Sequence, residues 1–171
     1  LKADGDRSKL LSLVDEADVL LDPYRPGVLE RLGLGPDVLL DRNKGLVVAR
    51  LTGWGQTGQY AQMAGHDINY IAISGALSLF QRPGERPTFP VNLLGDFCGG
   101  SLPCALGIAL ALVERASSGK GQVVDAAMLD GAAFATTFLH RLVALGLWDD
   151  SRPGTNLLDG GAPFYDTYEC S

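Results

Sequence analysis

Two residues of this sequence combine a proton-carrying side chain with a predicted helix start, His66 and Asp96. His66 stands between Gly65 and Asp67, and apolar residues recur at helical spacing from Asp67 onward. The positive end of a helix dipole favours a neutral imidazole, so His66 can act as a general base. A second interpretation makes His66 a capping neighbour without chemistry, and spacing alone leaves both open.

Asp96 is the carboxylate whose surroundings most resemble those of a catalytic residue. It follows a short apolar run, stands among glycines and precedes a predicted helix at 101–116. Flanking glycines let a ligand approach the carboxylate closely, which a simple capping aspartate does not need. Solvent contact or a structural hydrogen bond explains Asp125 and Asp130, and a surface position explains His140.

Composition and charge exclude several classes of protein. The 171 residues carry 14 basic and 20 acidic side chains, a net charge of -6, which argues against nucleic acid or anionic membrane as the main partner. The stretch 52–58 lacks the lysine of a P-loop and does not fit GxGxxG. Three cysteines form no CxxC pair, which predicts a reducing compartment and no zinc site. The longest apolar stretch, 102–113, is shorter than the ~20 residues that span a bilayer, so no transmembrane helix is expected.

The elements that position these residues alternate between helix and strand, which predicts an α/β domain. The apolar run 46–51 is typical of a parallel strand buried on both faces. The glycine-rich stretch 95–100 is expected to interrupt the chain before the helix 101–116, which is apolar almost all round and therefore expected to be buried. The other expected elements are helices at 8–17, 26–32, 36–40, 67–75 and 128–147, and strands at 19–21, 122–126 and from 165.

Several segments of the chain resemble the α-methylacyl-CoA racemases, which belong to the type III CoA-transferase family. The resemblance covers essentially the whole chain, and GHDINY followed by GDF thirty positions later is specific to the racemase branch. The segments are DPYRPGVLERLGLGP (22–36), ARLTGWGQTG (49–58), AGHDINYIAISG (64–75), NLLGDFCGG (92–100), SSGKGQVVDAAMLDG (117–131) and LDGGAPFYDTYEC (158–170).

The resemblance implies an isomerase that inverts C2 of 2-methyl-branched acyl-CoA thioesters through an enolate. His66 and Asp96 are then the acid/base pair that exchanges the C2 proton, one on each face. The backbone N–H of Asp67 then stabilises the enolate oxygen at a helix start. The implied contacts to CoA are Arg25, Arg31 and Tyr70. No metal or redox cofactor is implied, since CoA is part of the substrate.

The resemblance also implies a fold and a domain division. The expected fold is a partial Rossmann-like large domain of the type III CoA-transferase fold, truncated at both ends, with a linker into a small domain. The expected parts are a CoA-binding domain at 1–126, a linker with one long helix at 127–164, and the start of the small domain at 165–171. The resemblance further implies that the complete protein assembles as an interlocked homodimer.

Three points stay open in the sequence. The acyl pocket of the family is rich in methionine, whereas this chain has only Met63 and Met128, so the acyl preference is open. Alternatives to the racemase are a CoA-transferase with Asp96 as nucleophile, or a catalytically inactive truncated chain. We expect an intracellular protein, cytoplasmic in a bacterium and mitochondrial or peroxisomal in a eukaryote.

Overall fold

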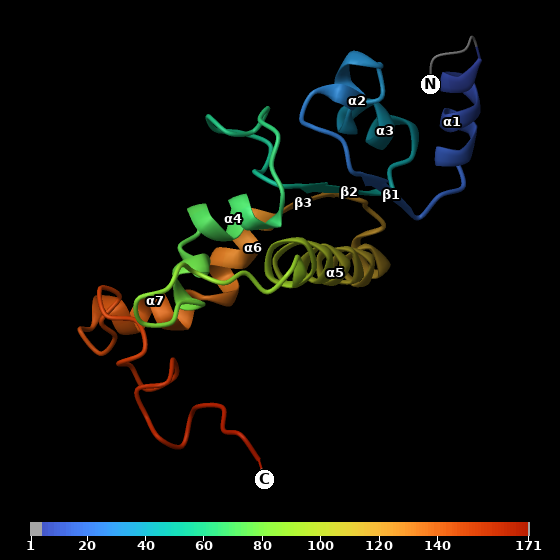
Figure 1. The fold of residues 1–171 in the computed structure, drawn as a ribbon. Helices are drawn as coiled ribbons and strands as arrows, with labels where there is room; N and C mark the ends of the chain where they lie inside the picture. The colour runs from blue at the N-terminus through green and yellow to red at the C-terminus, as the bar shows by residue number, and fades with distance from the viewer. Residues whose placement is uncertain (1–4, 171) are drawn as a thin grey trace.

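A three-stranded parallel sheet forms the centre of the computed structural model, which describes residues 5–170 (Figure 1). The strands are β1 (Val19–Asp22), β2 (Val47–Thr52) and β3 (Val123–Ala127), in the order β1-β2-β3. The residues at 47–49 are completely buried, as expected for a strand with neighbours on both edges and helices on both faces. The predicted α/β class and the buried strand at 46–51 are confirmed.

Helices cover both faces of the sheet (Figure 1). On one face lie α1 (Asp6–Val14), α2 (Val28–Arg31) and α3 (Pro36–Arg42), and on the other lies α5 (Leu102–Ser118). Successive side chains of a strand point to opposite faces. Val48 therefore packs with the leucines of α1, α2 and α3, whereas Ala49 packs with Cys104 of α5.

A second group of helices carries the predicted chemistry. It consists of α4 (Asp67–Ile73), the 3-10 helix η1 (Ala76–Leu79), the π-helix η2 (Leu93–Ser101) and α6 (Met128–Ala135). Their common core is formed by Ile71, Ala76 and Ala132, with Leu77 and Leu94 packed against it. The predicted helix start at Asp67 is confirmed.

We expected the glycine-containing segment 95–100 to be a non-helical break before the helix at 101–116, and this expectation is wrong. These residues form the π-helix η2, which continues directly into α5. A Cβ atom on Gly99 would lie 2.6 Å from the backbone nitrogen of Ala132 and 2.8 Å from the carbonyl oxygen of Met128. Glycine is therefore needed here because η2 and α6 touch through their backbones, and not because the chain turns.

The continuous helix Leu93–Ser118 has 26 residues and is long and apolar enough, by length and composition alone, to cross a membrane. The helix packs on β2, β3 and α6, and 22% of its apolar window is buried. Pro103 does not end the helix, and it stands where the π-helix η2 passes into α5.

Three further expectations need correction. The single helix expected at 128–147 divides at Thr136 into α6 and α7 (Thr137–Ala144), because the Thr136 hydroxyl donates a hydrogen bond to the Ala132 carbonyl (2.9 Å) and its backbone leaves the helical region. No strand forms over 165–170, within the part of the chain that is described. The helix at 101–116 is not fully buried, since an apolar stripe on α5 is 60 to 70% exposed: Leu102, Leu106, Leu110 and Val113.

His140 lies exposed on α7, as expected, with its Nε2 atom 3.1 Å from the Thr136 hydroxyl.

Candidate active site

A cavity of about 310 Å³ lies where β1 and β2 end. Its walls come from the loop after β1 (23–26), the end of β2 and the loop after it (51–54), and residues 61–66. In parallel sheets, ligands bind beyond the carboxyl ends of the strands, and this cavity has that position. Among the predicted site residues, Arg25, His66 and Tyr70 line it. Both methionines of the chain, Met63 and Met128, line it as well.

The side chain of Asp67 connects the two predicted proton carriers. Asp67 is the first residue of α4 and follows His66 directly. Its buried carboxylate accepts hydrogen bonds through Oδ2 from the backbone N–H groups of Gly95 (2.6 Å) and Asp96 (2.8 Å). These N–H groups belong to the first turn of η2, which has no acceptor inside the helix. The predicted pair His66 and Asp96 is thus held at two helix starts joined by one carboxylate.

His66 is the N-cap residue of α4, and its imidazole is exposed. The side-chain oxygen of Asn69 accepts a hydrogen bond from the His66 backbone N–H (2.9 Å), and the Asn69 N–H donates to the His66 carbonyl (2.8 Å). This reciprocal pairing fixes the backbone of His66 and leaves its ring on the cavity wall. The capping role and the chemical role considered for His66 are therefore compatible.

Asp96 is half-buried, and its side chain is held within its own helix. The Asn92 side-chain amide donates to Asp96 Oδ2 (3.2 Å), and the Ser101 hydroxyl donates to the Asp96 carbonyl (2.9 Å). The sequence interpretation missed Asn92, although it stands four residues before Asp96, at the spacing of neighbours on a helix. The glycine expected to admit a ligand, Gly95, instead admits Asp67: a Cβ there would lie 2.8 Å from Asp67 Oδ2.

Tyr70 couples the cavity to Asp96 and Arg25. Burial and the negative charge of Asp96 raise the pKa of Tyr70, while the Arg25 guanidinium acts in the opposite direction. The phenol therefore stays a neutral hydrogen-bond donor across the physiological pH range. Its ring packs edge-on against Trp54, with centroids 4.8 Å apart and planes at 83°. A Cβ on Gly65 would lie 2.7 Å from Cε1 of the same ring, which explains a glycine before His66.

A buried ion-pair network shapes the loop that carries Arg25. Arg50, at 6% exposure, donates from Nε to Asp22 Oδ2 (3.1 Å) and from Nη1 to Glu30 Oε1 (2.8 Å). Although burial acts in the other direction, these bonds hold the pKa of Glu30 below its usual value. Arg50 thus ties the ends of β1 and β2 to α2 on either side of the loop at 23–27.

The two arginines predicted to contact CoA differ in position. Arg25 is exposed and lines the cavity. Arg31 is exposed on α2, with its guanidinium folded toward Gly27, and is not part of that lining. The structure therefore brings Arg25, His66 and Tyr70 together, with Asp96 and Asp67 beside them, and leaves Arg31 at the edge.

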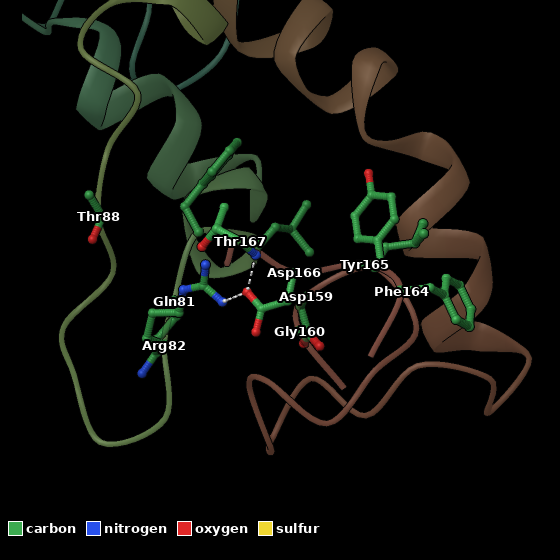
Figure 2. Close-up of a pocket in the computed structure, with 12 residues that line it drawn as sticks. Gln81, Arg82, Thr88, Asp159, Gly160, Phe164, Tyr165, Asp166 and Thr167 are labelled. Atoms are coloured by element: carbon green, nitrogen blue, oxygen red, sulfur yellow. Dashed lines mark hydrogen bonds and ion pairs between the residues drawn. The ribbon is translucent and has the colours of Figure 1, made fainter. Parts of the chain in front are cut away.

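A second and larger cavity, about 560 Å³, lies elsewhere in the molecule (Figure 2). It is formed by residues 79–82, Thr88 and the C-terminal segments 158–160 and 164–167, and an ion pair between Arg82 and Asp166 (3.3 Å) joins its two sides. None of the predicted site residues lines it. Within residues 5–170, no cluster of three or more His, Cys, Asp or Glu side chains is arranged to hold a metal ion.

Comparisons with known proteins agree with this fold. A crystal structure of a CAIB/BAIF family protein from Brucella suis superposes with a TM-score of 0.78 at 30% identity, over 85% of this chain and 38% of that one. This places the domain in the class of the type III CoA-transferase fold. The whole chain, residues 1–171, matches CoA-transferase family III, and the chain belongs to that family.

Two curated relatives extend the match. The chain is 52% identical over 168 residues to human alpha-methylacyl-CoA racemase, which covers 98% of this chain and 44% of that protein. It is 43% identical over 172 residues to a CaiB/baiF CoA-transferase family protein of Caenorhabditis elegans, covering 99% of this chain and 50% of that protein. The chain thus spans about half the length of these relatives.

Proposed function

We propose that the protein epimerises C2 of 2-methyl-branched acyl-CoA thioesters by proton transfer between His66 and Asp96. The observation that carries the proposal is the link through Asp67, whose carboxylate binds the Asp96 N–H while its backbone continues from His66. His66 lines the cavity together with Arg25 and Tyr70, and the Asp96 carboxylate is near enough to Tyr70 for its charge to raise the pKa of that phenol. The similarity to human alpha-methylacyl-CoA racemase supports the same reaction.

The reaction needs one proton carrier on each face of C2. The first residue, as base, removes the C2 proton, and the electron pair of that bond moves into the C1–C2 bond while charge builds on the thioester oxygen. The resemblance assigns that oxygen to the backbone N–H of Asp67. The second residue, already protonated, delivers its proton to the opposite face as the charge returns to carbon. Atoms and electrons balance, and the two residues exchange protonation states.

The substrate's CoA portion requires positive charge near the cavity. Although the chain as a whole carries a charge of -6, Arg25 lines the cavity mouth and Arg31 stands on the next helix. Met63 and Met128 give the same cavity two flexible apolar side chains that suit a branched acyl group. We propose that no metal or redox cofactor takes part, because the enolate is reached by proton transfer alone.

The test is deuterium incorporation from heavy water into each enantiomer of a 2-methylacyl-CoA, with the protein expressed from its complete reading frame. His66→Ala and Asp96→Ala are each expected to abolish inversion, since either change leaves one face of the enolate unserved. Each variant retains α-proton exchange on the face served by the remaining residue. His140→Ala and Asp130→Ala, the same residue types outside the cavity, keep the parent rate. Inversion near the parent rate in both site variants would contradict the proposal.

The same experiment separates the racemase from a CoA-transferase. In a transferase Asp96 attacks the thioester carbonyl, forming a mixed anhydride and releasing the CoA thiolate. The thiolate then attacks the aspartyl carbonyl of the anhydride, which gives an aspartyl-CoA thioester and releases the acyl group as a carboxylate. Loss of activity only in Asp96→Ala, with a covalent adduct on Asp96 by mass spectrometry, favours the transferase. Absence of both exchange and adduct favours an inactive chain.

We further propose an intracellular homodimer as the working assembly. The family resemblance supports this, and the exposed apolar stripe on α5 (102–113) gives the chain a surface that a subunit can cover. Light scattering coupled to size exclusion measures the assembly, and a monodisperse monomer would contradict it.

A further inference from the structure

The carboxylate of Asp67 is the buried acid closest to the proposed chemistry, and its own role is unassigned. The side chain is 4% exposed and accepts two backbone hydrogen bonds through the same oxygen, Oδ2. The other oxygen, Oδ1, is buried and has no hydrogen-bond partner within the described residues. A carboxylate buried with one oxygen unpaired is costly, so a fold keeps it only where it is useful.

The carboxylate of Asp67 is held by short hydrogen bonds and close packing. Two charge-assisted hydrogen bonds of 2.6 and 2.8 Å are short, and such bonds are about twice as strong as neutral ones. A Cβ on Gly95 would lie 3.0 Å from Cγ and 3.2 Å from Cα of Asp67, so the first turn of η2 rests directly on the start of α4. The position of the Asp96 backbone is therefore set by where Asp67 places Oδ2.

We propose that the Asp67 carboxylate is a positioning residue that fixes the separation between His66 and Asp96, an inference that rests on the proposed racemisation. Asp67 is covalently attached to His66, whose backbone is locked by Asn69, and it is hydrogen-bonded to Asp96. One side chain thus sets the spacing of both proton carriers. Its action is on geometry, because its carboxylate lies behind the helix starts and touches backbone N–H groups.

Spacing matters strongly in a reaction that uses two faces of one carbon. Each proton carrier must approach C2 to ~3–3.5 Å, and a displacement of about 1 Å costs roughly 100-fold in rate. Asp67→Asn keeps the shape and an acceptor oxygen, with its NH₂ group placed at the unpaired Oδ1 position. Asp67→Glu keeps the charge but moves the acceptor by one methylene against Gly95, where no space exists.

The two substitutions separate the shape of the Asp67 side chain from its charge, and their effects on kcat therefore test the positioning role. We expect Asp67→Asn to retain inversion within about tenfold, and Asp67→Glu to lower kcat roughly 100-fold. KM is expected to stay near the parent value in both, because Arg25 and Tyr70 remain in place. Asp67→Glu as active as Asp67→Asn, or a rise in KM with unchanged kcat, would overturn the proposal. Loss of the folded state in the isosteric Asp67→Asn would assign Asp67 to stability and overturn it as well.

Amide hydrogen exchange supplies a second readout that does not depend on activity. In Asp67→Ala the amides of Gly95 and Asp96 are expected to lose protection, while the rest of η2 stays protected. Asp159 offers a matched control, since its carboxylate accepts the N–H groups of Gly154 (2.9 Å) and Asn156 (2.7 Å) away from the His66 cavity. Asp159→Ala is expected to expose those two amides and leave inversion unchanged. Unchanged protection of Gly95 and Asp96 in Asp67→Ala would refute the positioning role. If the parent protein does not racemise its substrate, but Asp67→Ala still loses amide protection at Gly95 and Asp96, only the proposed function is contradicted.

Discussion

A single methyl group on Gly131 tests the close approach of η2 and α6. Gly131 lies inside α6, where replacing glycine by alanine in open space stabilises a helix by about 1 kcal/mol. Here the added Cβ would meet the Gly99 carbonyl oxygen and would lie 2.5 Å from the Gly99 carbonyl carbon and 2.6 Å from its Cα. These are backbone atoms of η2, so no side chain can rotate out of the way. The expected sign is therefore the reverse of the helix-propensity effect.

The magnitude follows from the overlap. Carbon atoms pack at about 3.5–4.0 Å, so the two helices must separate by at least about 1 Å to admit the methyl group, since its contact with the Gly99 carbonyl oxygen is closer still. Overpacking of this kind costs about 1–3 kcal/mol, and contact between rigid backbones favours the upper end. For a chain of this size, about 3 kcal/mol lowers Tm by roughly 6–12 °C. Because η2 also carries Asp96, a shift of about 1 Å is expected to slow inversion roughly 100-fold.

Urea and thermal unfolding of Gly131→Ala, followed by circular dichroism, measure this cost. Gly45→Ala is the control, because a Cβ there would meet only Asn43 Oδ1 at 3.5 Å and Arg115 Cδ at 3.8 Å, which are ordinary contacts. The control is expected to stay within about 0.5 kcal/mol of the parent. A Gly131→Ala protein as stable as the control, or more stable, would refute the backbone contact between η2 and α6.

Three further outcomes are expected. Arg25→Ala is expected to weaken CoA binding, and to reduce its salt dependence, more than Arg31→Ala does, because Arg25 lines the cavity. Titration calorimetry at two salt concentrations measures the affinity and its salt dependence. Unchanged affinity in both variants would remove both arginines from the site. Arg50→Met leaves the carboxylate of Asp22 buried without its partner, which is expected to cost about 3–5 kcal/mol in urea unfolding, whereas a loss under 1 kcal/mol would contradict a buried network. Partial desolvation raises the pKa of Asp125, although the residue stays exposed, so its charged form opposes folding only slightly. Asp125→Asn is expected to raise Tm a little at pH 7, with the gain shrinking as pH falls through the pKa of Asp125, and an equal gain at pH 7 and at pH 3 would contradict this cause.

Local patterns in the sequence predicted the parts of the fold that depend on neighbours along the chain. The apolar run at 46–51 identified the buried central strand, and the spacing after His66 identified the start of α4. The glycines at 95–100 misled the prediction for a definite reason. Glycine disfavours a helix on local grounds, but here the backbone of Ala132, more than thirty residues away, occupies the space that a side chain would need.

The candidate site likewise has residues that local sequence patterns predict and residues that only distant contacts define. Residue type and a predicted helix start made His66 and Asp96 candidates, although Asp96 lies in the first turn of η2 and not before the helix expected at 101–116. The helical spacing could also have pointed to Asn92. The side-chain role of Asp67 had no local signal, because its partners are the amides of Gly95 and Asp96, 28 and 29 residues further along the chain. Only the packing of α4 against η2 brings that carboxylate to those donors.

The edge-on contact between Trp54 and Tyr70 gives the cavity an intrinsic optical signal. The chain has two tryptophans, and Trp54 lines the cavity whereas Trp148 is buried in the loop after α7. Indole emission responds to nearby charge and to solvent, so a thioester entering beside Tyr70 changes the fluorescence of Trp54 and leaves that of Trp148 constant. With Trp148 replaced by phenylalanine, the remaining tryptophan emission of this chain comes from Trp54 in the cavity, and ligand entry can be followed in real time without a label.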